Sequence, residues 1–119
     1  MNRQHLHYRT KQLALRVIKM TETLPDSRAA NVIARQILRS ATSVGANYRA
    51  SMRAKSTADR IHKLKIVEEE ADETLYWLEL LVEANIVSQN LLQGLMAETN
   101  EILAMTVASI KTLRHRKNS

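Results

Sequence analysis

The chain has 119 residues, and its 18 Lys and Arg against 12 Asp and Glu give a formal net charge of +6 at pH 7. This length suits a single domain with a modest core. The absence of cysteine excludes disulfides, thiolate metal sites and cysteine nucleophiles. Only two glycines and one proline are present, and this shortage of turn-forming residues predicts an all-α protein.

The first predicted helix spans about residues 5–24. Its apolar positions are separated alternately by four and three residues, which is typical of a helix that buries one side. They form a single seam of Leu6, Thr10, Leu13, Val17, Met20 and Leu24. Pro25 ends this helix because proline lacks the amide proton, and Asp26 or Ser27 can cap the next one.

The second predicted helix spans about residues 27–55. Its buried side is formed by Ala30, Ile33, Ile37, Ala41, Val44, Tyr48 and Met52. Gly45 interrupts this pattern, and glycine costs about 1 kcal/mol relative to alanine inside a helix. We therefore expect Gly45 and Ala46 to allow close approach of a neighbouring helix.

The opposite side of the second helix carries a stripe of arginines within an arc of about 80°. Its members are Arg28, Arg35, Arg39, Arg49 and Arg53. Three interpretations remain open: a solvated face, ion pairs with acidic residues of the third helix within or between subunits, and contacts to phosphate. Arginine suits phosphate because its guanidinium group can form two parallel hydrogen bonds. The chain has few aromatic residues, so such contacts would be to the nucleic-acid backbone with little sequence preference.

The third predicted helix spans about residues 57–85, and Ser56 with Asp59 is typical of the capping box that starts a helix. Its core seam is Ile61, Leu64, Val67, Ala71, Leu75, Leu78 and Val82. The fourth predicted helix spans about residues 88–114 and is followed by a frayed basic tail, residues 115–119. This helix has two adjacent apolar seams, one through Leu95 and Ile102 and one through Met96 and Leu103.

The apolar surface of the third and fourth helices is larger than one bundle hides, since each helix buries about one seam and its flanks. This surplus predicts association of the protein with itself. The predicted oligomer interface consists of Tyr76, Trp77, Leu80, Leu81, Met96 and Leu103.

Four helices joined by short loops predict an antiparallel up-down-up-down four-helix bundle, which occupies residues 1–119 as one domain. In this arrangement both ends of the chain lie near the middle connection. Fourteen of the 18 Lys and Arg residues fall in residues 1–16, 47–66 and 108–119, together with a single carboxylate, that of Asp59. These segments would form one basic pole, which attracts phosphate. The predicted nucleic-acid-binding residues are Arg3, Arg9, Lys11, Arg49, Arg53, Lys55, Arg60, Lys63, Arg114, Arg116 and Lys117.

Catalytic motifs are absent from the sequence. A carboxylate-bridged metal pair in a bundle requires Glu-x-x-His on two helices, but no glutamate here has a histidine three residues later. Glycine-rich phosphate loops and nucleophile elbows are also missing. We therefore expect no metal, no cofactor and no enzymatic activity. The apolar runs are too short to span a membrane and Met1–Thr10 has no apolar signal core, so we expect a cytoplasmic protein.

Two segments resemble a known family. They are Thr42-Ser43-Val44-Gly45-Ala46-Asn47 and the set of Glu69, Ala71, Glu73, Thr74, Tyr76, Trp77 and Leu78. The chain resembles, in these motifs and in helix number and order, the small four-helix-bundle proteins encoded in intervening sequences of bacterial 23S rRNA genes.

This resemblance implies a homopentameric ring around a central pore. It also implies kinship with the accessory protein of diversity-generating retroelements, a basic pentamer associated with nucleic acid beside a reverse transcriptase. The expected function is therefore an oligomer that binds the RNA or DNA backbone through its basic pole. The alternative is a scaffold that docks an acidic protein partner or an enzyme.

Overall fold

The computed structural model describes residues 3–118, and within them the chain forms four α-helices and no strand. They are α1 (Arg3–Thr21), α2 (Arg28–Met52), α3 (Thr57–Glu83) and α4 (Gln89–Asn118). The molecule is an elongated rod with extents of 51 × 22 × 19 Å. The all-α prediction is confirmed.

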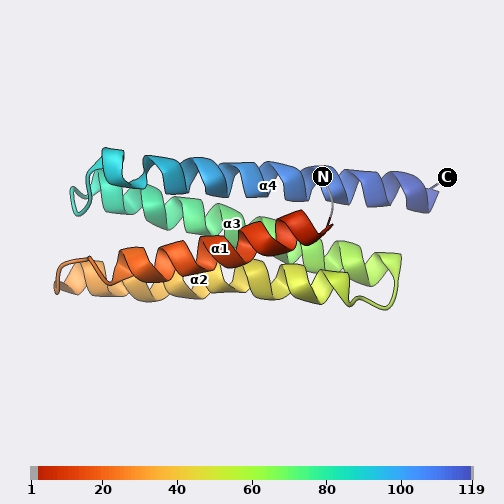
Figure 1. Ribbon diagram of the computed structural model, residues 1–119, viewed down its shortest axis with the longest axis horizontal. Coiled ribbons are helices and arrows are strands. Elements are labelled where there is room, and N and C mark those ends of the chain that lie inside the picture. Colours follow the sequence, from red (N-terminus) through yellow and green to blue (C-terminus); the bar gives the residue numbers. More distant parts are fainter. Residues whose placement is uncertain (1–2, 119) are drawn as a thin grey trace.

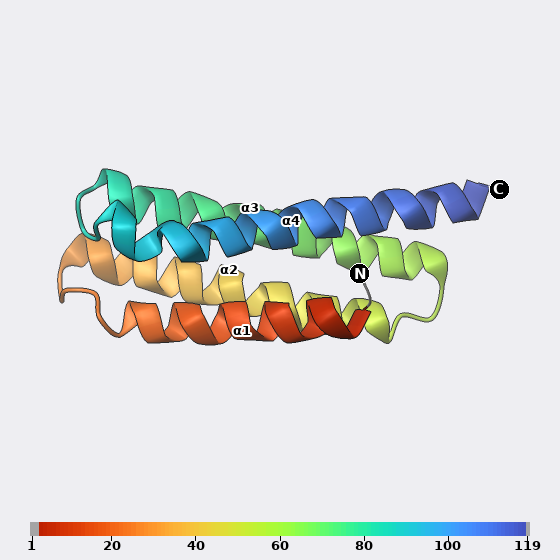
Figure 2. The ribbon, with the colours of Figure 1, turned by 45° about the horizontal axis from the view of Figure 1, so that its top comes forward.

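Consecutive helices are joined at alternate ends of the rod (Figure 1). The α1–α2 and α3–α4 connections lie at one end. The α2–α3 connection lies at the other end, towards which the N-terminal turns of α1 and the C-terminal turns of α4 also point (Figures 1 and 2). Across residues 3–118, α1 contacts α2 and α4 but not α3. The helices α1 and α3 therefore lie diagonally opposite each other.

Two predicted caps begin helices. The Ser27 side chain accepts a hydrogen bond from the Ala30 amide (3.2 Å), and the Ser56 side chain accepts one from the Asp59 amide (3.0 Å). These bonds satisfy amides that have no partner within their own helix. Asn85 follows the end of α3 with φ of 60°, a left-handed conformation that asparagine tolerates better than most residues.

The helix ends differ from the prediction in two ways. The first three helices end two or three residues earlier than expected. The fourth continues to Asn118, so the predicted frayed tail is helical as far as the structure describes it, and Ser119 lies outside the described residues. No glycine or proline follows Arg114, and cations stabilise the negative end of the helix dipole, so nothing stops the helix there.

The core lies where the apolar seams predict it. Leu13, Val17, Ile37, Leu64 and Leu78 are fully buried between the four helices. On α4 the seam of Leu95 and Ile102 faces the core, whereas Met96 and Leu103 flank it and are half-buried. Ile110, seven residues after Leu103, is buried as well, so the buried side changes from one seam to the other towards the end of the helix.

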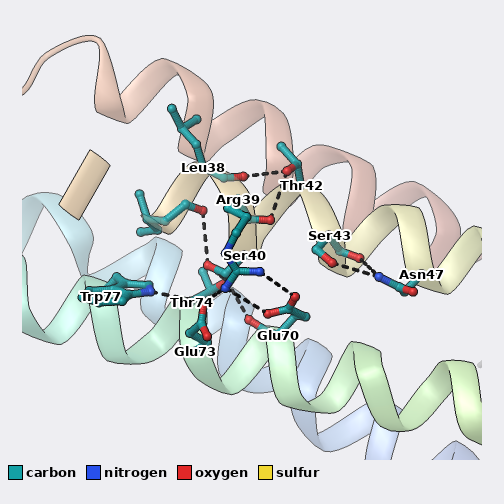
Figure 3. A network of polar contacts seen from close by, with 11 residues as sticks. Leu38, Arg39, Ser40, Thr42, Ser43, Asn47, Glu70, Glu73, Thr74 and Trp77 are labelled. Carbon is teal, nitrogen blue, oxygen red and sulfur yellow. Dashed lines mark hydrogen bonds and ion pairs between the residues drawn. The ribbon is translucent and has the colours of Figure 1, made fainter. Parts of the chain in front are cut away.

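A polar network fixes α2 against α3 (Figure 3). The hydroxyls of Ser40 and Thr74, both buried, share a hydrogen bond of 2.9 Å, and the Glu70 carbonyl oxygen accepts a second bond from Thr74 at 2.8 Å. Buried hydroxyls without partners would cost about 1–3 kcal/mol each. A shift of one helix along the other would separate this pair, so the network selects one register.

At the rim of the same contact, Arg39 of α2 pairs with two carboxylates of α3 (Figure 3). Its Nη1 lies 2.9 Å from Glu70 Oε2, and its Nη2 contacts Glu73. The Trp77 indole N–H also donates to Glu73, at 3.4 Å. The network thus extends from the core to the surface of the α2–α3 contact.

Two contacts position α1, one with α2 and one with α4. On one side, a Cβ atom placed on Gly45 of α2 would lie 3.4 Å from the Thr10 carbonyl oxygen, which is ordinary van der Waals contact. On the other side, Arg9 binds Glu98 of α4 through two hydrogen bonds, from Nε (2.9 Å) and Nη2 (2.5 Å). The Arg9 side chain is only 16% exposed and the Glu98 side chain 22%. Hydrogen bonds from Arg9 lower the pKa of Glu98 against the opposing effect of burial.

We predict opposite effects of small and large side chains at Gly45. Gly45→Ala should raise the free energy of unfolding by up to about 1 kcal/mol, because a methyl group makes ordinary contact with Thr10 and alanine favours the helix. Gly45→Leu should lower it by about 1–3 kcal/mol, because the larger side chain forces α1 away. Urea unfolding at fixed protein concentration measures both changes.

Gly94 of α4 provides the control, because a Cβ there would meet only the flexible end of Arg16, at 3.5 Å. Gly94→Leu should be tolerated. Equal stability of Gly45→Leu and Gly94→Leu would contradict the close packing of α1 on α2.

We predict that Glu98→Gln lowers the free energy of unfolding by about 1–2 kcal/mol at pH 7, because it removes a partly buried charged hydrogen bond. The pKa of Glu98 is lower in the folded protein, so the pair stabilises fully above the unfolded carboxyl pKa of about 4.3. This contribution is lost as the pH falls through the lower folded value. The two proteins should therefore converge in stability in acid.

Glu101→Gln is the matched control for this pair. Its carboxylate lies 3.1 Å from Arg9 Nη2 but the side chain is 64% exposed, so the loss should be about 0.5 kcal/mol or less. Equal losses for the two variants across the pH range would show that the Arg9–Glu98 pair has no special role.

Candidate nucleic-acid interface

Three basic segments lie in the same half of the rod. They are the N-terminal half of α1, the end of α2 with its connection to α3, and the last turns of α4 (Figures 1 and 2). Each segment contributes cations from a different part of the sequence. We call this region, residues 5–11, 47–66 and 108–116, the basic end. Arg16 does not belong to it, because its guanidinium group lies against Gly94 in the first turns of α4, towards the other end of the rod.

Five of the predicted binding residues are exposed at the surface. In the part of the chain that the structure describes, none of them has a carboxylate within ion-pair distance. They are Lys11, Arg49, Arg53, Lys55 and Arg114. Their charges are therefore available to an external anion.

The other predicted residues differ from these five. Arg60 and Lys63 are half-buried, and the Arg60 Nε is buried without a hydrogen-bond partner. Arg116 is exposed but has a partner within the molecule. The side chains of Arg3 and Lys117 lie outside the described residues.

Arg9 corrects the prediction. Its guanidinium group is held by Glu98 and Glu101 and lies 3.3 Å from the Met105 sulfur. The hydrogen bond to Glu98 raises the pKa of Arg9, which stays charged, but its charge is used inside the molecule. Arg9 therefore stabilises the fold and does not belong to the free cations of the basic end.

The arginines of the α2 stripe do not all have the same surroundings. Arg39, in the middle of the helix, pairs with Glu70 and Glu73 of α3 in the same subunit. The other four are exposed and pair with no carboxylate among residues 3–118: Arg28, Arg35, Arg49 and Arg53. Only Arg49 and Arg53 of these lie in the basic end.

The separation of charge along the rod matters because salt screens charges over about 8–10 Å. The rod is 51 Å long, so the two ends act on a ligand independently. Outside residues 1–16, 47–66 and 108–119 the sequence has eleven acidic residues against four basic ones. The basic end is therefore a local source of positive potential on a molecule whose remainder is acidic.

The predicted oligomer interface is exposed only in part. Tyr76 is 52% exposed. Four other side chains of the predicted interface are half-buried against the core: Trp77, Leu80, Met96 and Leu103. Leu81 is fully buried, which corrects its assignment to an interface between subunits. It lies two turns after Thr74, whose hydroxyl meets Ser40 of α2, and the sequence of α3 alone did not show that this side is covered.

Sequence reasoning missed exposed apolar residues elsewhere. Tyr8, Leu15 and Ile18 lie on the outer side of α1 within an arc of about 80°, and are 56%, 51% and 39% exposed. Val32 and Leu91 are exposed as well. These residues lie on helix faces that are otherwise polar. A search of the sequence for apolar residues outside the core seams could have found them.

Metal sites and membrane spans are both missing from the described part of the chain. In residues 3–118, no group of three or more His, Asp or Glu side chains is placed to hold a metal ion. None of the helices described is both long enough and apolar enough to cross a membrane.

The comparisons with known proteins agree with the fold. The sequence matches the model of the 23S rRNA-intervening sequence protein family over residues 5–108. The structure is similar to a crystal structure from Bacteroides thetaiotaomicron of a protein of unknown function in the S23 ribosomal protein family. The TM-score is 0.87 and the identity 34%, over 93% of this chain and 99% of that one. No curated protein matches. With four helices in the same arrangement and a match over most of its length, the chain belongs to the 23S rRNA-intervening sequence protein family.

Proposed function

We propose that the protein is a non-enzymatic, homo-oligomeric protein that binds the phosphate backbone of RNA or DNA through its basic end. The observation that carries this proposal is the set of unpaired, exposed cations that three distant segments bring to one end of the rod. Such a surface releases counterions from a nucleic acid when it binds, which supplies affinity without sequence preference.

The kind of contact follows from the side chains present. Arg49 and Arg53 can each bind a phosphate through two hydrogen bonds, and Lys11 and Lys55 act as point charges. Of the four aromatic residues in the chain, Tyr48 is buried in the core and Trp77 packs against the core. Tyr8 and Tyr76 are exposed, and we assign both to the apolar surfaces that join subunits. Stacking on bases therefore contributes little, and the backbone is the target.

The oligomer we propose is a ring, and the family resemblance implies five subunits. A ring with cyclic symmetry requires two different, complementary surfaces on each subunit. Tyr76 lies on α3, and the stripe of Tyr8, Leu15 and Ile18 lies on α1, the diagonally opposite helix. Two apolar surfaces on opposite corners of the bundle can join subunits head to tail. We name them the α3 patch and the α1 patch.

We predict that binding of a mixed-sequence, 20-nucleotide RNA weakens steeply between 50 and 200 mM salt, as backbone binding requires. Reversing two charges in Arg49→Glu/Arg53→Glu should weaken binding at least about tenfold for every sequence tested. Fluorescence anisotropy measures both effects.

The control is Arg28→Glu/Arg35→Glu, which changes the net charge equally on the same helix but far from the basic end. Its affinity should stay within about threefold of the wild type, since distant charges are screened. Equal weakening by both double variants would show that net charge and not the basic end attracts RNA. Absence of binding at 50 mM salt would refute the proposed function.

We predict that Tyr76→Glu and Leu15→Glu each reduce the assembly to a 13.6 kDa monomer, because each places a charge in one of the two patches. A mixture of the two variants should form dimers only, since each variant keeps one intact patch. Light scattering after size exclusion measures the mass. Full-size assemblies of either variant would rule out its patch as an interface.

A further inference from the structure

A groove runs between α1 and α2 within reach of the basic end. Its volume is about 210 Å³, and the residues that line it are His7, Thr10, Lys11, Ala14, Thr42, Gly45, Ala46 and Arg49. From this groove we propose a new site: it seats one phosphodiester group of a nucleic acid between Lys11 and Arg49. This inference rests on the proposed function, and it states where on the protein one phosphate of the nucleic acid binds.

The charge of the groove has one sign. Among the described residues that line it, the charged or titratable ones are His7 and Lys11 from α1 and Arg49 from α2, and none is a carboxylate. Within the described residues, neither Lys11 nor Arg49 has an ion-pair partner. An anion between them would meet cations from two different helices, which is a more specific arrangement than a charged helix face.

One of the lining residues carries a buried polar atom without a partner. His7 Nδ1 is buried and forms no hydrogen bond. Most buried polar groups in proteins are hydrogen-bonded, so this nitrogen requires a partner that the isolated chain does not supply. This nitrogen has almost no surface open to solvent, so a phosphate oxygen in the groove could accept its proton only after the imidazole ring turns.

The other lining residues explain why no side chain fills the groove. Thr10, Ala14, Gly45 and Ala46 are small, so no side chain fills the volume between the cations. The Thr10 and Thr42 hydroxyls donate to backbone carbonyls of their own helices and so leave the groove open. A methyl group at Gly45 would fit without strain. Glycine therefore costs helix stability for no gain in packing, but it keeps this part of the groove empty.

The size and chemistry of the groove select its occupant. At about 210 Å³ it is smaller than the roughly 300 Å³ from which pockets for drug-sized ligands begin. No aromatic residue lines it, so it offers no surface on which a base can stack. A tetrahedral phosphate matches this volume and the cations beside it, whereas a base would have no aromatic partner among the described lining residues.

The decisive experiment fills the groove without changing its charge. Ala46 is exposed and lines the groove, so Ala46→Leu places a larger side chain there and leaves the core intact. We expect its affinity for the mixed-sequence RNA to fall about fivefold or more, because one charged hydrogen bond to phosphate can no longer form. The slope of log affinity against log salt should become shallower by about 0.7, the value for one phosphate of a single strand.

The control is Ala29→Leu, which adds the same side chain at an exposed position in the first turn of α2, away from the groove. It should bind as the wild type does. In a second set, Lys11→Gln and Arg49→Gln should each weaken binding, whereas Lys19→Gln and Arg35→Gln on the same two helices should not. Circular dichroism establishes that all variants are folded.

The outcomes separate the two proposals. If wild-type protein binds RNA and Arg49→Glu/Arg53→Glu does not, but Ala46→Leu binds as tightly as Ala29→Leu, the groove is not the site and the proposed function stands. If wild-type protein does not bind RNA at 50 mM salt, the proposed function fails and the phosphodiester site with it. Weaker binding of Ala46→Leu alone supports the site, because that variant carries every cation of the wild type.

Discussion

The contact between α2 and α3 determines the rest of the molecule. The hydrogen bond between Ser40 and Thr74 is buried, and it can form in one register only. With that register fixed, the end of α2 and the start of α3 form one end of the rod, and α1 and α4 pack alongside them (Figure 1). The gathering of cations at that end follows from the direction in which each helix runs.

Much of this fold could be predicted from the sequence because the required information is local. The spacing of Leu13 and Val17 or of Leu64 and Val67 shows which side of a helix is buried, and Ser56 with Asp59 marks a helix start. Contacts between distant residues could not be predicted in this way. Arg9 and Glu98 are separated by 89 positions, and only the packed structure shows that they neutralise each other.

The same limit applied to the arginine stripe and to Leu81. Periodicity places Arg39, Arg49 and Arg53 on one face of α2, but the register against α3 decides that Arg39 alone meets carboxylates. Leu81 belonged to an apparent surplus of apolar surface until the packed structure showed that its side chain is fully buried. The proposed binding and oligomer surfaces consist of the cations and apolar residues that stay exposed after packing, so a sequence overestimates both.

The groove and the α1 patch share one helix, and this connects binding with assembly. At about 100° per residue, Lys11 lies between Leu15 and Ile18 in angle around α1, and His7 and Ala14 lie next to them on the side of α2. A neighbouring subunit seated on the α1 patch would therefore border the groove and exclude water from one side of it. Exclusion of water strengthens the attraction between Lys11 and a phosphate. By linkage, a nucleic acid that prefers the bordered groove also stabilises the ring, so assembly and backbone binding would reinforce each other.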